Sequence, residues 1–523
     1  MTNLLSDRRR YLALWLPLLP TDRLHRRQER QKRNGATPDE VPLAVLCRQK
    51  GTLRIAHADR RAWTLGIRPG MTFADARARI PDIVFAEEDH DADLALRDDI
   101  ADWCDRYSPL VGIDGETGLI LDITGCTHLF SGEDALRADI TARLRTMGFS
   151  IRSAIAGTPD AARAVAQFSR GGVVPPGDEA ATVRPLPIAA LGVDAAQQLA
   201  LTRAGLKTIA DLADRPRAPL AARFGADLLA RIARTLGEVD HPISPRRPIP
   251  ELIAERRFAE PIARAEDILG TIRLLAGKLT PLLETRGAGG RHFEVIFFRT
   301  DGAVRRIAVV SGRPLRDAAV LTKLFAERLD ALTDPVDPGF GFDMIRLAVL
   351  ASEDLLQAQK QFDGRDKDDE AVAELIDRLS ARFGATQVLR FVPQDSHVPE
   401  RMARAVAALG SVQGAGTWPA RVIGEPPTYP LRLFNPPQPV KTFDVVPDSP
   451  PVRFLWRRMW RDIVASEGPE RIAPEWWRRG SEELTRDYFR VEDRDGRRYW
   501  LYREGLYGID PGKRPWFLHG LFA

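Results

Sequence analysis

A glycine cluster, Gly287-Ala-Gly-Gly290, is the segment of this 523-residue sequence whose residue types could cradle a phosphate. It lies between a predicted helix over 262–284 and a predicted strand over 292–299, so we interpret it as a connecting turn. The sequence contains no GxxxxGK(S/T), HExxH or GxSxG motif. It therefore offers no P-loop, no zinc-protease helix and no hydrolase nucleophile elbow.

Residues that bind zinc or do redox chemistry are few and scattered. The three cysteines, Cys47, Cys104 and Cys126, have no CxxC spacing, which argues against structural zinc and suits a reducing cytoplasm. The eight histidines are also dispersed, and we interpret a lone histidine such as His128 as structural. No metal and no cofactor is expected.

The composition is typical of a soluble globular protein of several domains, with 44% hydrophobic and 28% charged residues. Lys and Arg total 76 against 72 Asp and Glu, so nucleic-acid binding would depend on local basic patches. No apolar run is long enough to span a membrane. The run Tyr11 to Leu19 follows three arginines but contains Pro17, so we interpret it as a buried strand rather than a signal peptide. We expect a cytoplasmic protein.

Strands and helices alternate in the first part of the chain, which predicts an α/β layer. The predicted strands are 11–16, 43–46, 118–124 and 150–156, and the predicted helices are 92–107, 135–147 and 160–168.

Three further regions differ in character. Residues 186–236 have helical spacing and short turns, and a mixed helix and strand module follows the stiff, basic stretch 245–250. The last 83 residues hold six of the ten tryptophans, which predicts a small packed module rather than a disordered tail. Within it, residues 488–502 alternate around Asp495-Gly496, as in a β-hairpin.

Several motifs resemble the Y-family DNA polymerases, in that family's order. Ala62-Trp-Thr-Leu-Gly-Ile-Arg-Pro-Gly-Met71 resembles the fingers, and Leu119-Ile-Leu-Asp-Ile-Thr-Gly125 resembles a palm strand. Leu191-Gly-Val193, with Gly205 to Leu212, resembles the helix-hairpin-helix of the thumb. The module from about 250 to 350 resembles the little finger.

Three signatures resemble more closely the ImuB family, the polymerase-like subunits of a bacterial mutagenesis system. They are Arg10-Tyr-Leu-Ala-Leu-Trp-Leu-Pro17, Asp395-Ser-His-Val-Pro-Glu-Arg401, and a tail with Gly468 to Ile472, Trp476-Trp477, Glu504 to Tyr507 and Trp516 to Phe522. The resemblance covers nearly the whole chain.

The resemblance implies an α/β multidomain fold with a Y-family polymerase-like palm, fingers, helical thumb and α+β little finger, plus a C-terminal aromatic-rich module. The expected boundaries are 8–20 and 91–180 for the palm, 21–90 for the fingers, 181–244 for the thumb, 245–351 for the little finger, 352–370 for a flexible tether, 371–440 for a connecting region and 441–523 for a partner-binding module.

By the same resemblance, nucleotidyl transfer needs carboxylates that hold two divalent metals. In the active family the first strand ends in Asp, where this sequence has Trp15, and an acidic pair stands where it has Thr117 and Gly118. A shifted register would bring Asp114 and Glu116 to the palm surface, so a rearranged metal site stays open as the alternative. The triphosphate-gripping Tyr and Arg correspond to Arg60 and Trp63. We therefore expect no catalytic residues and no polymerase activity.

Binding functions remain. The hairpin residues Leu191, Gly192 and Val193 are expected to hold a DNA phosphate through backbone N–H groups, with Arg246 and Arg247 as further phosphate contacts. For the sliding clamp, the expected peptide is Gln359-Lys-Gln-Phe362, with Gln359 and Phe362 as its contacts, and the alternative is Pro430 to Phe434.

The resemblance implies a non-catalytic DNA- and protein-binding scaffold in SOS-induced error-prone translesion DNA synthesis after DNA damage. Its expected partners are DNA, the sliding clamp (the beta subunit of DNA polymerase III), an error-prone DNA polymerase III alpha-type subunit, ImuA and, as a further candidate, RecA. The alternatives are an active Y-family translesion polymerase with a rearranged metal site and a DNA-binding structural protein unrelated to lesion bypass.

Overall fold

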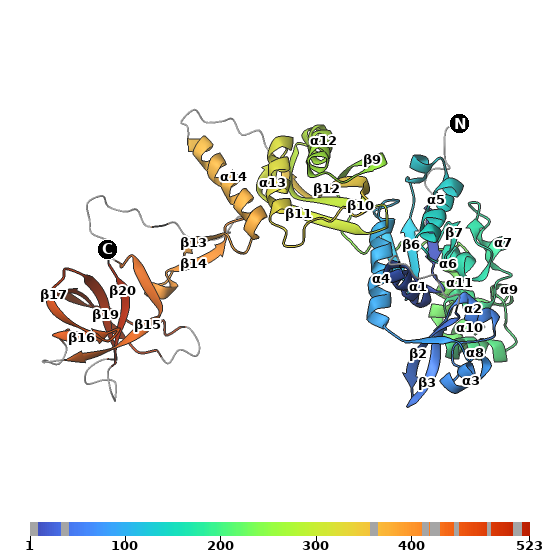
Figure 1. Ribbon diagram of the computed structural model, residues 1–523, viewed down its shortest axis with the longest axis horizontal. Helices are drawn as coiled ribbons and strands as arrows, with labels where there is room; N and C mark the ends of the chain where they lie inside the picture. The colour runs from blue at the N-terminus through green and yellow to red at the C-terminus, as the bar shows by residue number, and fades with distance from the viewer. Residues whose placement is uncertain are drawn as a thin grey trace. The chain divides into compact units, whose positions relative to one another are not determined.

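The computed structural model describes residues 9–32, 41–355, 365–410, 418, 429–443, 449–477, 483–505 and 515–522. The chain forms two compact units, residues 1–367 and 368–523. In Figure 1 the first unit begins in blue and the second unit ends in red. No helix in the described ranges combines the length and the apolar character needed to cross a membrane.

A five-stranded sheet forms the centre of the first unit, with strand order β5-β6-β1-β7-β8. Its strands are β1 (Tyr11–Trp15), β5 (Val111–Asp114), β6 (Gly118–Asp122), β7 (Arg152–Ala156) and β8 (Gly172–Val173). β1 pairs antiparallel with both β6 and β7. The strands predicted at 11–16, 118–124 and 150–156 are therefore confirmed, and they are neighbours in one sheet.

Both faces of this sheet are buried, because β1 is apolar throughout. Tyr11 and Ala13 face α6 (Pro159–Phe168), whose alanines allow the helix to lie close to the strands. Leu12 and Leu14 face the opposite core, which α4 (His90–Cys104) and α5 (Glu133–Thr146) cover. The Thr158 side chain accepts a hydrogen bond from the Ala161 N–H and caps α6, and Pro159 occupies its first position.

Two smaller groups of elements complete this part of the first unit. One is the three-stranded sheet β3-β2-β4 with its helices, namely β2 (Leu43–Gln49), β3 (Thr52–Ala58), β4 (Val84–Glu87), α1 (Leu19–Lys32), α2 (Arg60–Thr64) and α3 (Phe73–Arg79). The other is helical, namely α7 (Glu179–Val183), η2 (Ile188–Leu191), α8 (Ala195–Arg203), α9 (Ile209–Ala213), α10 (Arg217–Phe224) and α11 (Ala226–Thr235).

A four-stranded antiparallel sheet, ordered β11-β10-β12-β9, follows in the first unit. Its elements are β9 (Leu252–Ile262), α12 (Ala265–Thr285), β10 (Ala288–Arg299), β11 (Val304–Leu315), α13 (Ala318–Asp330) and β12 (Phe342–Asp354). The glycine cluster is a turn only at Gly287, where φ is +65°, because the next three residues already belong to β10.

The second unit contains a helix, a two-stranded sheet and a closed six-stranded barrel, drawn orange to red in Figure 1. The elements are α14 (Arg365–Phe383), β13 (Leu389–Pro393), η3 (Pro399–Arg401), β14 (Ala403–Ala407), β15 (Arg432–Phe443), β16 (Arg453–Trp456), β17 (Met459–Ile472), β18 (Arg486–Asp493), β19 (Arg498–Glu504) and β20 (Trp516–Leu521). The hairpin predicted over 488–502 is confirmed as β18 and β19.

Two expected boundaries differ from the structure. The predicted tether 352–370 is strand as far as Asp354 and helix from Arg365. The aromatic module expected from residue 441 begins earlier, since β15 starts at Arg432 and closes the barrel by pairing with β20. The start of α14 was not predicted because its sequence is charged and shows no clear periodicity. The barrel was not predicted because β15 contains the adjacent Pro436 and Pro437 and β16 is short.

Candidate functional site

The residues that replace the expected metal ligands lie together at one edge of the five-stranded sheet. Trp15 is the cross-strand partner of Gly118, and the Leu16 N–H donates a 2.8 Å hydrogen bond to the Thr117 carbonyl oxygen. The structure therefore brings the positions that the resemblance singled out to one edge of the sheet. The aromatic ring of Trp15 faces the Arg152 guanidinium, 5.3 Å from the ring centroid.

Gly118 closes this edge to any other side chain. Asp114 pairs with Gly118 across β5 and β6, and a Cβ atom on Gly118 would overlap the Asp114 carbonyl oxygen. The same Cβ would lie 3.2 Å from the Asp114 Cβ and carboxylate. A ligand carboxylate at position 118 would therefore need the backbone of β5 to move.

Asp114, the centre of the alternative metal site, lies beside a cation. Arg163 of α6 places its Nη1 3.6 Å from the Asp114 Oδ1, and its Nη2 donates to Asp160 Oδ1 at 2.7 Å. Burial raises the pKa of the Asp114 carboxyl, and the Arg163 guanidinium opposes that rise. Glu116 is exposed in the β5–β6 turn. Asp114 thus balances a guanidinium charge.

Within the described ranges, no group of three or more His, Cys, Asp or Glu side chains could hold a metal ion. Asp122, at the other end of β6, accepts a 3.0 Å hydrogen bond from the Thr124 N–H. This carboxylate fixes the turn after the strand. The donor set at the sheet edge does not fit a two-metal centre.

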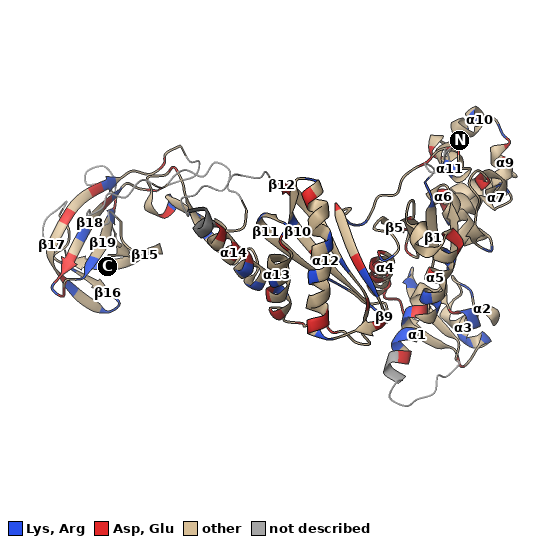
Figure 2. Cartoon of the chain, turned by 90° about the horizontal axis from the view of Figure 1, so that it is seen from above, with Lys and Arg blue, Asp and Glu red and all other residues tan. Residues whose placement is uncertain are grey.

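The two residues that stand where the active family grips the triphosphate have different surroundings. Trp63 is half-exposed on α2 and lies 4.4 Å beneath the Arg68 guanidinium. Arg60 is exposed and lines a cavity of about 690 Å³ together with His25 and Arg145. Figure 2 shows the Lys and Arg residues of α1 and α2 in blue.

In the hairpin Leu191-Gly192-Val193, the Leu191 side chain and the Gly192 backbone groups already make contacts within the protein. Leu191 is fully buried, and the Gly192 N–H donates a 3.0 Å hydrogen bond to the Ala189 carbonyl oxygen. Gly192 adopts a φ of +68°, and its carbonyl oxygen accepts a 3.0 Å hydrogen bond from Arg231. The Gly192 N–H expected to bind a DNA phosphate is therefore already engaged in a hydrogen bond within the turn.

Arg246 and Arg247 converge on one carboxylate of α4. Arg246 Nη1 donates to Asp102 Oδ1 at 2.8 Å, and Arg247 Nη2 donates to both Asp102 oxygens at 3.0 Å. The Arg246 guanidinium is mostly buried, whereas 42% of the Arg247 side chain is exposed. Together they hold the segment after α11 against α4, and only Arg247 retains substantial access to solvent.

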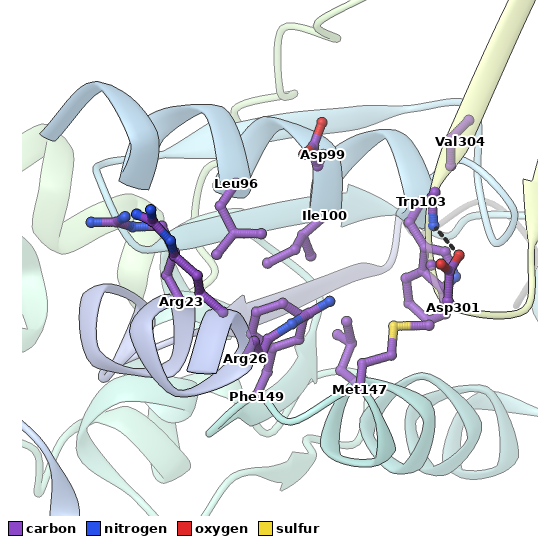
Figure 3. Close-up of a pocket in the computed structure, with 14 residues that line it drawn as sticks. Arg23, Arg26, Leu96, Asp99, Ile100, Trp103, Met147, Phe149, Asp301 and Val304 are labelled. Carbon is purple, nitrogen blue, oxygen red and sulfur yellow. Dashed lines mark hydrogen bonds between the residues drawn. The ribbon is translucent and has the colours of Figure 1, made fainter. Parts of the chain in front are cut away.

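A cavity that the sequence analysis did not predict lies between α1, α4, the residues after α5 and the β10–β11 turn (Figure 3). Its volume is about 420 Å³, and Arg23, Arg26, Trp103 and Phe149 contribute to its lining. The Trp103 indole N–H is buried without an acceptor among the described residues. Four separate segments form this lining, so no local sequence pattern could have revealed it.

The two candidate clamp peptides have different outcomes. Gln359 and Phe362 fall outside the described residues. In the alternative peptide, Phe434 is buried in the barrel core, while Leu431 is 84% exposed.

The signature Asp395 to Arg401 lies against the barrel of its own unit. Glu400 Oε1 accepts a 2.7 Å hydrogen bond from Arg486, and Arg401 donates to Glu475 at 3.2 Å and to Glu483 at 2.6 Å. His397 bonds the Ala473 carbonyl oxygen at 2.8 Å. These motif residues are structural contacts within the second unit.

Comparison with known proteins supports the assignment from the motifs. Residues 30–167 match the model of the impB/mucB/samB family, and residues 250–366 match that family's C-terminal domain. The chain is 39% identical to "Protein ImuB" of Caulobacter vibrioides over 88% of this chain and 100% of that protein.

More distant likenesses involve polymerases. "DNA polymerase IV" of Alkalilimnicola ehrlichii is 26% identical over 57% of this chain and 84% of that protein. A solved structure, "Post-insertion binary complex of Dbh DNA polymerase", is 15% identical, with a TM-score of 0.39 over 65% of this chain and 98% of that chain. Identity and coverage are highest for the Caulobacter relative among these three, and on that basis the chain belongs to the ImuB family.

Proposed function

We propose that this chain is a non-catalytic DNA- and protein-binding scaffold in SOS-induced error-prone translesion DNA synthesis. The observation that carries the proposal is the edge of the five-stranded sheet. There Trp15 stands beside Gly118, no side chain fits at position 118, and Asp114 is balanced by Arg163. An edge of this kind cannot hold the two metals that nucleotidyl transfer requires.

The rival function, an active polymerase with a rearranged metal site, depends on Asp114. This carboxylate lies at the right edge of the sheet, which favours the rival. Two metal ions, however, need several carboxylates, and Glu116 is exposed in the turn while Arg163 already faces Asp114. The scaffold is therefore the better account.

DNA is the first proposed partner, through phosphates rather than bases. Arg247 is the better candidate contact of the linker pair because its side chain is the more exposed. Binding should have little sequence preference and should weaken as salt rises. Titration of the full chain with primed and single-stranded DNA at several salt concentrations tests this, and salt-independent binding or no binding would refute it.

The proposed protein partners are the sliding clamp, an error-prone DNA polymerase III alpha-type subunit and ImuA, with RecA as a further candidate. These follow from membership of the ImuB family. A pull-down with the tagged chain from DNA-damaged cells should recover them. If none of the four proteins is recovered, the proposed scaffold role is refuted.

For the clamp, we propose the peptide that contains Gln359 and Phe362. Changing both residues to Ala should abolish clamp binding, because the clamp would lose both proposed contacts, and the melting temperature measured beside it checks that the variant is folded. A Leu433→Ala, Phe434→Ala variant is the matched control and should bind the clamp but unfold more easily. Normal clamp binding by the first variant, with loss in a folded second variant, would identify the other peptide.

A further inference from the structure

The hairpin of β16 and β17 carries arginines and aromatic rings on the outside of the barrel. Phe454 of β16 is fully buried in the barrel core, so its neighbours Arg453 and Leu455 point outward. Cross-strand pairing places Phe443 opposite Arg453, and Lys441 and Trp460 opposite Leu455. We define the basic-aromatic face as the outward residues of these strands and the hairpin tip: Lys441, Phe443, Arg453, Arg457, Arg458 and Trp460.

The rings of this face are accessible to a ligand. Phe443 is 60% exposed and Trp460 is 46% exposed. The Arg453 guanidinium lies 4.3 Å above the Trp460 ring, and the Arg457 guanidinium lies 4.6 Å from the ring of Trp456. Flat guanidinium and indole groups are therefore arranged side by side along one hairpin, and each offers a surface on which a planar group can stack.

Among the described residues, the cationic side chains of this face form no close ion pair. In the described part of the chain, no carboxylate lies within ion-pairing distance of Lys441, Arg453, Arg457 or Arg458. Eight other arginines of β17, β18, β19 and the β18–β19 turn differ, because each has a carboxylate partner: Arg461, Arg471, Arg486, Arg490, Arg494, Arg497, Arg498 and Arg503. Asp462, in the same row as Arg453, lies 3.6 Å from Arg494. Figure 2 shows the barrel strands with Lys and Arg in blue.

The backbone at the tip is strained. Arg457 and Arg458 form the two-residue turn, with φ values of +48° and +66°. Such turns favour Asn-Gly, because residues with a larger side chain disfavour the left-handed region. Two arginines therefore occupy positions where the fold would prefer other residues, which points to a function for their side chains.

We propose that the basic-aromatic face binds single-stranded nucleic acid, with bases stacking on its rings and phosphates held by its guanidinium groups. Proteins that bind single strands without sequence preference combine a positive surface with exposed aromatic side chains, and this face has both. Charge complementarity favours a polyanion over a protein partner. The site belongs to the second unit, and the inference rests on the proposed DNA-binding function, to which it adds a second contact surface.

The experiment uses the full chain and labelled oligothymidylate of about 16 nucleotides, within the range of site sizes for small barrels. The variant R457N/R458G introduces the preferred turn pair, so it should be at least as stable as the wild type while it binds about tenfold more weakly. Its salt dependence should fall by about 1.4 in slope, for two lost phosphate contacts on a single strand. W460A should weaken binding about fivefold or more, as expected for one stacked base.

The matched control is R497Q/R498Q, which also removes two positive charges but from the β18–β19 hairpin, where Arg497 pairs with Asp495 and Arg498 pairs with Glu492. It should bind within about twofold of the wild type, since paired surface charges contribute little. Oligouridylate and a duplex of equal length serve as further probes. Tighter binding of oligouridylate than oligothymidylate would assign the face to RNA, and the reverse would assign it to DNA.

Ultraviolet crosslinking to oligothymidylate, followed by peptide mapping, should place the crosslink within 441–460. Wild-type affinity in both R457N/R458G and W460A would overturn the proposal, even if the variants lost a protein partner. An equal loss in the R497Q/R498Q control would also overturn it, because the effect would then reflect only total charge.

Discussion

The edge of the five-stranded sheet and the basic-aromatic face of the barrel differ in how far their charged side chains are available to a ligand. At the sheet edge, Gly118 has no side chain and Asp114 faces Arg163. On the barrel, Arg457 and Arg458 are exposed at a tip with a left-handed backbone. Metal catalysis needs several ligands in one narrow geometry, so a few substitutions remove it. Binding to phosphates and bases needs only accessible charge and flat rings, so it can be built on a hairpin.

The sheet edge should resist restoration of a carboxylate. Gly118→Asp should lower the free energy of unfolding by about 4 kcal/mol, because the new side chain overlaps the β5 backbone and adds a charge beside buried Asp114. Chemical denaturation at neutral pH measures this.

Thr117→Asp is the matched control, because Thr117 is adjacent and only half-buried. Its effect should stay below about 1 kcal/mol. Equal stability of the two variants would mean that a side chain can be accommodated at position 118. The claim that the sheet edge excludes a ligand carboxylate would then be wrong.

The barrel depends on its aromatic core rather than on its exposed rings. Phe434→Ala should lower the free energy of unfolding by about 3 kcal/mol, since this ring packs in the core with Trp456. Leu431→Ala, at a residue that is 84% exposed, should change it by less than about 0.5 kcal/mol. A similar loss in both variants, measured by thermal and chemical denaturation, would show that the segment before β15 also contributes to the core.

Two buried groups, one in each unit, should change stability with pH in opposite directions, and the first is His519 of the barrel. Burial lowers the pKa of His519 to about 4, against the effect of Glu400 and with that of Arg486. The native state therefore binds fewer protons than the unfolded state between pH 4 and pH 6.5. The stabilisation is complete above the ordinary value of 6.5 and is lost as the pH falls toward 4, by about 3 kcal/mol. His519→Gln should remove this dependence.

Asp105 has the reverse effect in the first unit. Burial raises the pKa of Asp105 to about 6, although the neighbouring Arg306 guanidinium opposes the rise. The native state then binds more protons, so the contribution of this carboxyl is complete below 3.8 and is lost as the pH rises through 6. Denaturation of Asp105→Asn and His519→Gln against the wild type across this range tests both signs. Slopes of the same sign would contradict the contrast.

The sequence predicted the parts of the fold that local patterns encode. β1, β6 and α6 follow from apolar runs and capping residues, and alignment with an active palm placed Trp15 and Gly118 at one edge. The closure of position 118 could not be predicted, because it depends on the Asp114 carbonyl oxygen of the adjacent strand.

Contacts between distant residues account for the other differences. The pairing of Arg246 and Arg247 with Asp102 joins segments that no periodicity connects. The barrel closes where Val440 pairs with Trp516, a contact between its first and last strands. The basic-aromatic face could have been suspected from Arg-Phe-Leu-Trp-Arg-Arg-Met-Trp over 453–460, but only the register shows which side chains point outward.

Primer extension tests the central claim most directly. The purified full chain, supplied with primed template, nucleotides and Mg²⁺ or Mn²⁺, should add no nucleotide, because Trp15, Thr117 and Gly118 stand at the metal-ligand edge. Metal-dependent extension that Asp114→Ala or Glu116→Ala abolishes would contradict this account and establish a rearranged metal site.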